Sequence, residues 1–176
     1  MKYLPKITFK NLKPQIADAI KESCYRIDAR FYNIANEVRN IVTNSIEPGV
    51  EIAKDLSKII DKTIKDSVVV GCDLSVIVKG ILLGAFRASP FMREEAHKTI
   101  RILIDEILRA VFECKGDIKQ TVEGLLAGIV ILSREFKLNT QEALIIAKED
   151  ILSSAKEIGP QFADDVKQVL PNLNDL

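Results

Sequence analysis

Apolar residues between Pro14 and Ile46 recur alternately every four and every three positions. This spacing is the heptad seam of a helix that packs along a neighbour, and Pro14 suits the first position of such a helix. A helix over residues 14–46 would be about 50 Å long at a rise of 1.5 Å per residue, so it needs an equally long partner surface. We therefore predict self-association through the seam positions Ile20, Ile27, Phe31, Ile34, Val38 and Ile41.

The rest of the chain has amphipathic helical periodicity, interrupted at residues that commonly start or end helices. No segment shows the alternation of a strand. We expect an all-α protein of about seven helices, built as an elongated bundle or as a short helical repeat array. The bundle is favoured, because the long first helix can lie across the later ones. The predicted boundaries are Pro48 with Gly49, Gly71 followed by the N-cap Asp73, Ser89 with Pro90, Gly116 with Asp117, the N-cap Asn139, and Gly159 with Pro160.

A self-similarity appears when the chain is compared with itself at an offset of 44 residues. Each unit is a helix, a turn and a second helix that begins at an aspartate. A third copy fades towards the C-terminus, as the terminal units of helical arrays often do. The matching pairs are Ile60 and Ile104, Asp61 and Asp105, Asp73 and Asp117, Val78 and Val122, Gly80 and Gly124, Leu82 and Leu126, and Gly84 and Gly128.

These features predict a single helical domain over residues 14–170. The domain comprises the long helix at 14–46, two repeats at 48–88 and 90–136, and a degenerate capping repeat at 139–170. A basic extended arm, residues 1–13, precedes it, and a tail, residues 171–176, follows it. The two ends differ in charge: residues 1–17 hold four lysines and no acid, whereas residues 142–176 hold seven acids and three lysines.

Two helices each contain a pair of glycines four residues apart, Gly80 with Gly84 and Gly124 with Gly128. Glycine inside a helix costs about 1 kcal/mol relative to alanine, so these positions need a physical reason. A spacing of four puts both glycines on one face, where another helix backbone can approach closely. We expect helix packing at these four glycines. The alternative is a lipid-inserting or self-assembling glycine zipper.

Composition narrows the classes of partner. The 25 basic and 25 acidic residues give no net charge, and only 6% of residues are aromatic, so nucleic acid is not an expected partner. Three widely spaced cysteines and the lack of a signal-peptide pattern favour a reducing, cytoplasmic location. The longest nearly apolar run, 68–86, contains Asp73 and Lys79, which disfavours a membrane span.

No catalytic constellation is visible, and we predict no enzyme activity, cofactor or metal. His97 is the only histidine, and its spacing from Glu94 makes one half of a di-iron motif, so a metal-dependent bundle enzyme is a remote alternative. A zinc set of His97 with three cysteines lacks any local ligand pair. We expect the cysteines to be packed thiols and Asp105, Asp150 and the other paired acids to be solvated. Those cysteines are Cys24, Cys72 and Cys114.

The segments E-G-L-L-A-G (123–128), L-N-T-Q-E-A (138–143) and A-K-E-I-G (155–159) resemble bacterial helical-repeat proteins that have Gly-x-x-x-Gly helices. The resemblance covers about the last two thirds of the chain and implies an α-helical fold without a known activity. The long amphipathic helices are also similar in character to phasins, the coat proteins of storage granules. We therefore predict a non-enzymatic, self-associating interaction or scaffolding protein. The alternative is a peripheral binder of an anionic lipid or granule surface.

Overall fold

The computed structural model describes residues 35–36, 38–40, 52–88 and 96–170. The described residues are helical apart from short turns, and none of them belongs to a strand. The predicted all-α class is therefore confirmed. The helices that follow residue 51 are α3 (Ile52–Val70), α4 (Leu74–Ala88), α6 (Ala96–Cys114), α7 (Ile118–Glu135), α8 (Thr140–Ile158) and α9 (Pro160–Val169).

Several predicted features lie outside the described residues. They include the basic arm, the tail, most of the long first helix, and the boundaries at Pro48 and at Pro90. Of the predicted seam only Val38 is described, and it is 2% exposed. The undescribed seam positions are Ile20, Ile27, Phe31, Ile34 and Ile41.

The helices repeat with the spacing predicted from the sequence. Helices α3, α6 and α8 begin at residues 52, 96 and 140, which are 44 residues apart, and α4 and α7 begin at residues 74 and 118. Only α9 departs, because it begins at Pro160, two residues earlier than the repeat would place it. The terminal unit of the described helices is thus the irregular one.

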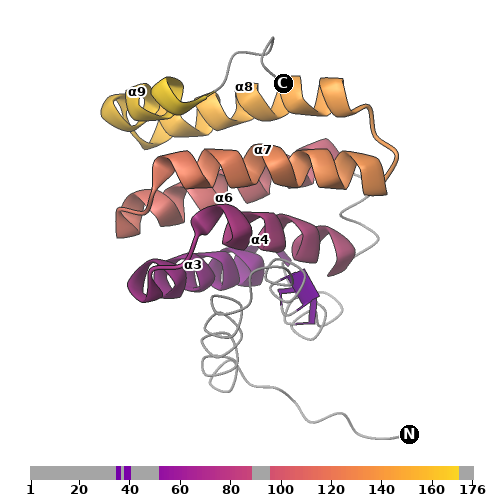
Figure 1. The fold of residues 1–176 in the computed structure, drawn as a ribbon, viewed down its shortest axis with the longest axis horizontal. Coiled ribbons are helices and arrows are strands. Elements are labelled where there is room, and N and C mark those ends of the chain that lie inside the picture. Colours follow the sequence, from indigo (N-terminus) through magenta and orange to yellow (C-terminus); the bar gives the residue numbers. More distant parts are fainter. Residues whose placement is uncertain (1–34, 37, 41–51, 89–95, 171–176) are drawn as a thin grey trace, which may run out of the picture.

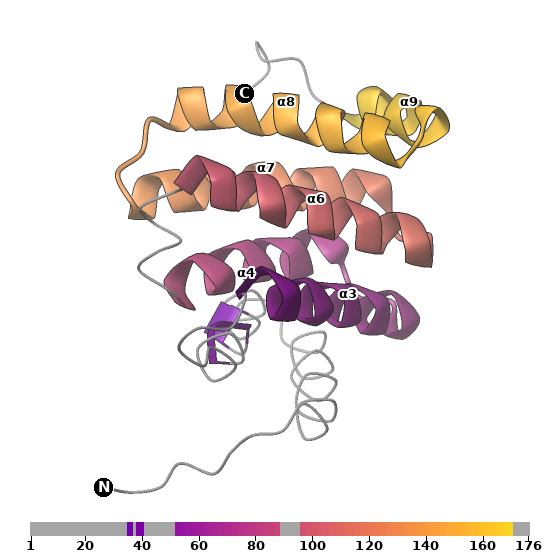
Figure 2. The ribbon, with the colours of Figure 1, turned by 180° about the vertical axis from the view of Figure 1, so that it is seen from behind.

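The repeats stack into two layers (Figures 1 and 2). Helices α3, α6 and α8 form one layer, in which each packs on the next, and α4, α7 and α9 form the other. This is the repeat-array form of the predicted fold. Helix α7 lies in the middle and contacts α4, α6, α8 and α9, which explains why its sequence is apolar on nearly every face.

Recurring caps set the length of each helix. Gly71, Lys115 and Lys137 follow α3, α6 and α7 with φ values of 74°, 55° and 56°. After each, an amide donates to a carbonyl five residues back, at 2.8–2.9 Å, which is the Schellman arrangement. The aspartate and asparagine caps predicted for the following helices are confirmed. The side chains of Asp73 and Asp117 accept hydrogen bonds from the backbone amides of residues 75 and 120. The side chain of Asn139 accepts from the amides of residues 141 and 142.

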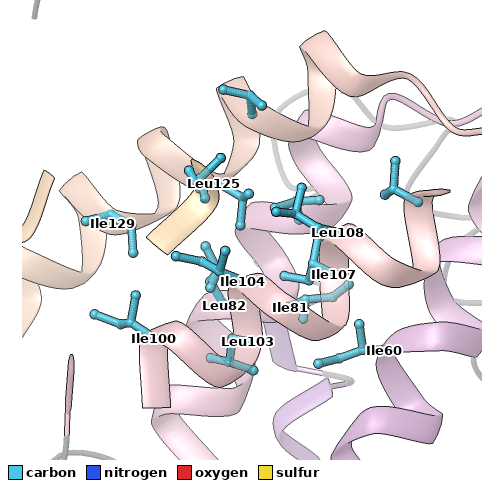
Figure 3. Packing of buried hydrophobic residues seen from close by; sticks show 14 of the residues in the cluster. Ile60, Ile81, Leu82, Ile100, Leu103, Ile104, Ile107, Leu108, Leu125 and Ile129 are labelled. Carbon is cyan, nitrogen blue, oxygen red and sulfur yellow. The ribbon is translucent and has the colours of Figure 1, made fainter. Parts of the chain in front are cut away.

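Between the layers lies a continuous hydrophobic core (Figure 3). Leu103, Ile104, Ile107 and Leu108 of α6 are all fully buried. Two helical turns of α6 therefore face inward, with α3 and α4 on one side and α7 on the other. The labelled partners in Figure 3 are Ile60, Ile81, Leu82, Leu125 and Ile129.

The glycine helices are positions of close approach. A Cβ on Gly84 would lie 2.5 Å from the carbonyl oxygen of Ala35, and one on Gly124 would lie 2.7 Å from that of Ser75. At Gly128 the nearest atom is Leu82 Cδ1, at 2.5 Å. Helix α4 itself thus covers Gly124 and Gly128 of α7. Gly80 is buried on α4.

Candidate functional site

Three helix junctions meet at one edge of the array, which we call the loop edge. They are the turn between α3 and α4, the turn between α6 and α7, and Gly159 between α8 and α9 (Figure 1). The first two are in direct contact, because a Cβ on Gly116 would lie 2.9 Å from Leu74 Cδ1 and 3.3 Å from Val68 Cγ2. The connection between α7 and α8 lies at the opposite edge.

A cleft of about 500 Å³ opens at the loop edge between the end of α6 and the start of α9. Apolar side chains supply most of its lining, while charged and amide groups lie among them. This volume lies within the range of common ligand and side-chain sites. The lining residues are Val111, Phe112, Glu113, Lys115, Gly116, Ile118, Gln161, Phe162 and Asp165.

The cleft contains an aromatic pair. Phe112 and Phe162 meet edge to face, with ring centroids 5.3 Å apart and an interplanar angle of 69°. Phe162 is buried, whereas Phe112 is 51% exposed. On the same edge Val69 is 86% exposed and Val70 is 44% exposed. Large apolar residues that are exposed together indicate an interaction site more strongly than scattered ones.

Charged groups of both signs surround the cleft. Glu113 forms an ion pair with Lys65 of α3 at 2.8 Å, and Asp165 accepts a hydrogen bond from the Gln161 amide at 3.1 Å. Lys115 is exposed, and among the described residues it has no ion-pair partner. Lys115 and Asp165 thus lie on the lining of one cleft. A partner that presents an acidic group and a basic group can pair with both.

The Lys65–Glu113 pair is one rung of a repeated ladder on the layer of α3, α6 and α8. Asp61 and Lys65 pair along α3 at 2.7 Å, and Lys65 reaches Glu113 of α6. The next rung, 44 residues on, has Arg109 bound to Asp105 at 3.0 Å and to Glu157 at 3.6 Å. The hydrogen bonds that the Lys65 ammonium donates to the carboxylates of Asp61 and Glu113 raise the pKa of Lys65. The bond with Asp105 raises the pKa of Arg109.

Two of the paired acids differ from the expectation of full solvation. The side chain of Asp150 is only 13% exposed, and its burial raises the pKa of its carboxyl, against the attraction of Arg101. Asp105 Oδ1 is buried and has no hydrogen-bond partner, although Oδ2 accepts from Arg109. Packing of α6 on α8 covers these carboxylates, and the periodicity of a single helix does not show that contact.

The cysteines also differ from expectation. Cys72 is disulfide-bonded, so the prediction of a packed thiol is wrong there, while Cys114 is a free, half-buried thiol. Burial raises the pKa of Cys114, and its thiol donates to the Val111 carbonyl at 3.7 Å.

The residues proposed for metal chemistry are not brought together in the described ranges. His97 is exposed in the first turn of α6, and Glu94 lies outside the described residues. No group of three potential metal ligands occurs among the residues that the structure describes. Within the same ranges, no helix has both the length and the hydropathy that crossing a bilayer requires.

The cleft has no signal in the sequence. Phe112 falls on the face of α6 that the helical periodicity assigns to solvent, and only the packing of α9 gives it an aromatic partner. The ladder had a readable signal, because Lys65 and Arg109 share the offset of 44 with Glu113 and Glu157. No protein-family model matches the chain, and comparison with curated proteins finds no significant match. The function is therefore argued from geometry.

Proposed function

We propose that this chain is a non-enzymatic interaction or scaffolding protein whose binding surface is the loop edge. The observation that carries the proposal is the exposure of Val69, Val70 and Phe112 on one edge, beside an apolar cleft. Val69 and Val70 lie at the exposed end of α3. A helix end that faces only solvent has no need of apolar side chains. Burying such side chains against a partner yields about 25 cal/mol per Å² of apolar surface.

The rest of the array suits the role of a rigid support. The core is continuous from α3 to α9, and the ladder joins neighbouring repeats on the outer surface. Residues presented at the loop edge are therefore held by packed helices rather than by long connections. A surface fixed in this way loses little conformational entropy when it binds.

Recovery of partners from the cell that makes the protein tests this proposal. The tagged full chain would be purified as wild type, as Val69→Asp and as Ile145→Asp. Ile145 is a matched control, because it is a 41% exposed aliphatic residue on α8 away from the loop edge. We expect a stoichiometric polypeptide with wild type and Ile145→Asp, and its loss with Val69→Asp. Equal recovery with all three, or no polypeptide with any, contradicts the proposal.

The lipid-surface alternative requires a larger structural change. The apolar faces of the glycine helices are already buried: ten residues of α4 and nine of α7 have no appreciable exposure. Presenting them to a membrane would separate α4 from α7 and expose that core. Flotation of the purified chain on vesicles of anionic phospholipid would favour this alternative. We propose no binding to nucleic acid and retain the cytoplasmic location only as a prediction.

A further inference from the structure

We propose that the partner at the loop edge is a second copy of this chain, docked through a twofold contact across the cleft. This inference rests on the proposed function, since it names the occupant of the same surface. In a twofold contact the same patch serves both copies, so the patch must be complementary to itself. The loop edge meets this requirement in shape and in charge.

The complementarity in shape comes from a projecting ring beside a hollow. Phe112 is half exposed at the cleft, and Phe162 lies buried behind it. Val69 lies four residues after Lys65 on α3, and Lys65 reaches Glu113 on the cleft lining, so Val69 adds an exposed apolar side chain on the α3 side of the loop edge. Two such edges placed face to face cover the exposed rings and both clefts. Aromatic residues that fill pockets are the usual anchors of protein interfaces.

The complementarity in charge comes from Lys115 and Asp165, which lie on the lining of one cleft. Lys115 makes no ion pair within the described part of the chain, and Asp165 accepts a hydrogen bond from the Gln161 amide. A twofold axis through the cleft brings Lys115 of each copy opposite Asp165 of the other, which gives two identical ion pairs. Glu113 is already neutralised by Lys65. The chain has no net charge, so two copies meet without long-range repulsion.

Sedimentation and light scattering of the full chain measure this contact. Wild type should reach twice the chain mass of 19.6 kDa as concentration rises. Phe112→Asp should weaken dimerisation at least about thirtyfold, as loss of an interface anchor does. Val69→Asp should act in the same direction, and its 86% exposure keeps it folded if Phe112→Asp does not fold. Ile145→Asp should dimerise like wild type.

A charge exchange tests the pairing itself. Lys115→Asp and Asp165→Lys should each weaken the dimer about tenfold, because each places like charges opposite one another. The double variant restores opposite charges and should return to within about threefold of wild type. Circular dichroism melting curves verify that each variant is folded.

Three results would overturn the inference: a wild-type chain that stays monomeric, a Val69→Asp variant that dimerises like wild type, or a double charge variant no stronger than the single ones. The fate of the proposed function is separate. If another polypeptide is recovered through Val69 while the chain stays monomeric, the loop edge is a binding surface and only its occupant is wrong. If neither a second copy nor another polypeptide depends on Val69, both proposals fail.

Discussion

Gly124 of α7 lies so close to Ser75 of α4 that a Cβ on the glycine would be 2.7 Å from the serine carbonyl oxygen and 2.8 Å from its Cα. Both atoms belong to the backbone, so neither can move unless the helices separate. The glycine spacing seen in the sequence therefore corresponds to a helix–helix contact between successive repeats.

Gly124→Ala should destabilise the fold. Overpacking against backbone costs about 1–3 kcal/mol, and the better helix propensity of alanine returns about 1 kcal/mol. We expect a net loss of up to about 2 kcal/mol in the free energy of unfolding, measured by urea denaturation. Gly128→Ala is the matched control, because its Cβ would meet the end of the Leu82 side chain, which can change rotamer. Equal or greater loss in the control contradicts this account of the contact.

Substitution by glycine of the residue in the left-handed conformation after α7 should stabilise the fold. Lys137 has a φ of 56°, which costs a residue with a side chain about 1 kcal/mol more than glycine. Lys137→Gly should therefore raise the free energy of unfolding by about 1 kcal/mol. Lys119→Gly, in the first turn of α7, should lower it by up to about 1 kcal/mol, because glycine is a poor helix former. The same sign for both substitutions would show that the cap does not determine the effect.

Asp150 should make the array less stable as pH rises. Burial raises the pKa of its carboxyl above the ordinary 3.8, so the folded state binds the proton more tightly than the unfolded state. Stability then falls as pH increases from that ordinary value through the raised one. Asp150→Asn should remove this decrease and be the more stable form at pH 7. The free energy of unfolding of both proteins, measured between about pH 4 and 7, checks the sign. A wild-type free energy of unfolding that rises more steeply with pH than the variant's contradicts it.

The two described cysteines should differ in reactivity. Cys114 is a half-buried thiol whose raised pKa lowers the fraction of reactive thiolate at neutral pH. Its alkylation should be slow at pH 7. The rate should continue to rise at pH values above those at which an ordinary cysteine is already ionised. Cys72 should stay unlabelled until a reductant is added, because it is disulfide-bonded. Peptide mass spectrometry separates the two sites, and rapid labelling of Cys72 without reductant contradicts the structure.

Much of the fold could be predicted because its determinants are local or periodic. Asp117 and Asn139 could be recognised as N-caps from their residue types and positions. Both side chains accept hydrogen bonds from backbone amides, as expected. The offset of 44 residues predicted the spacing of helices from α3 to α8. Both features depend on short stretches of sequence, so neither needed knowledge of tertiary packing.

The site could not be predicted, because it depends on contacts between distant segments. Phe112 meets Phe162 across 50 residues, and α9 begins two residues before its repeat position. Burial of Asp150 likewise comes from the packing of α8 on α6. The seam of the first helix, predicted as an intermolecular surface, has one described member. That member, Val38, packs within the chain on Gly84.

Photo-crosslinking in the cell most directly tests the claim that the loop edge is a protein-binding surface. A photoreactive amino acid would replace Val69 in one chain and Ile145 in another, since both positions are exposed. The account predicts a discrete adduct with a polypeptide at position 69 and none at position 145. Crosslinks to lipid alone, or the same adducts at both positions, would contradict it.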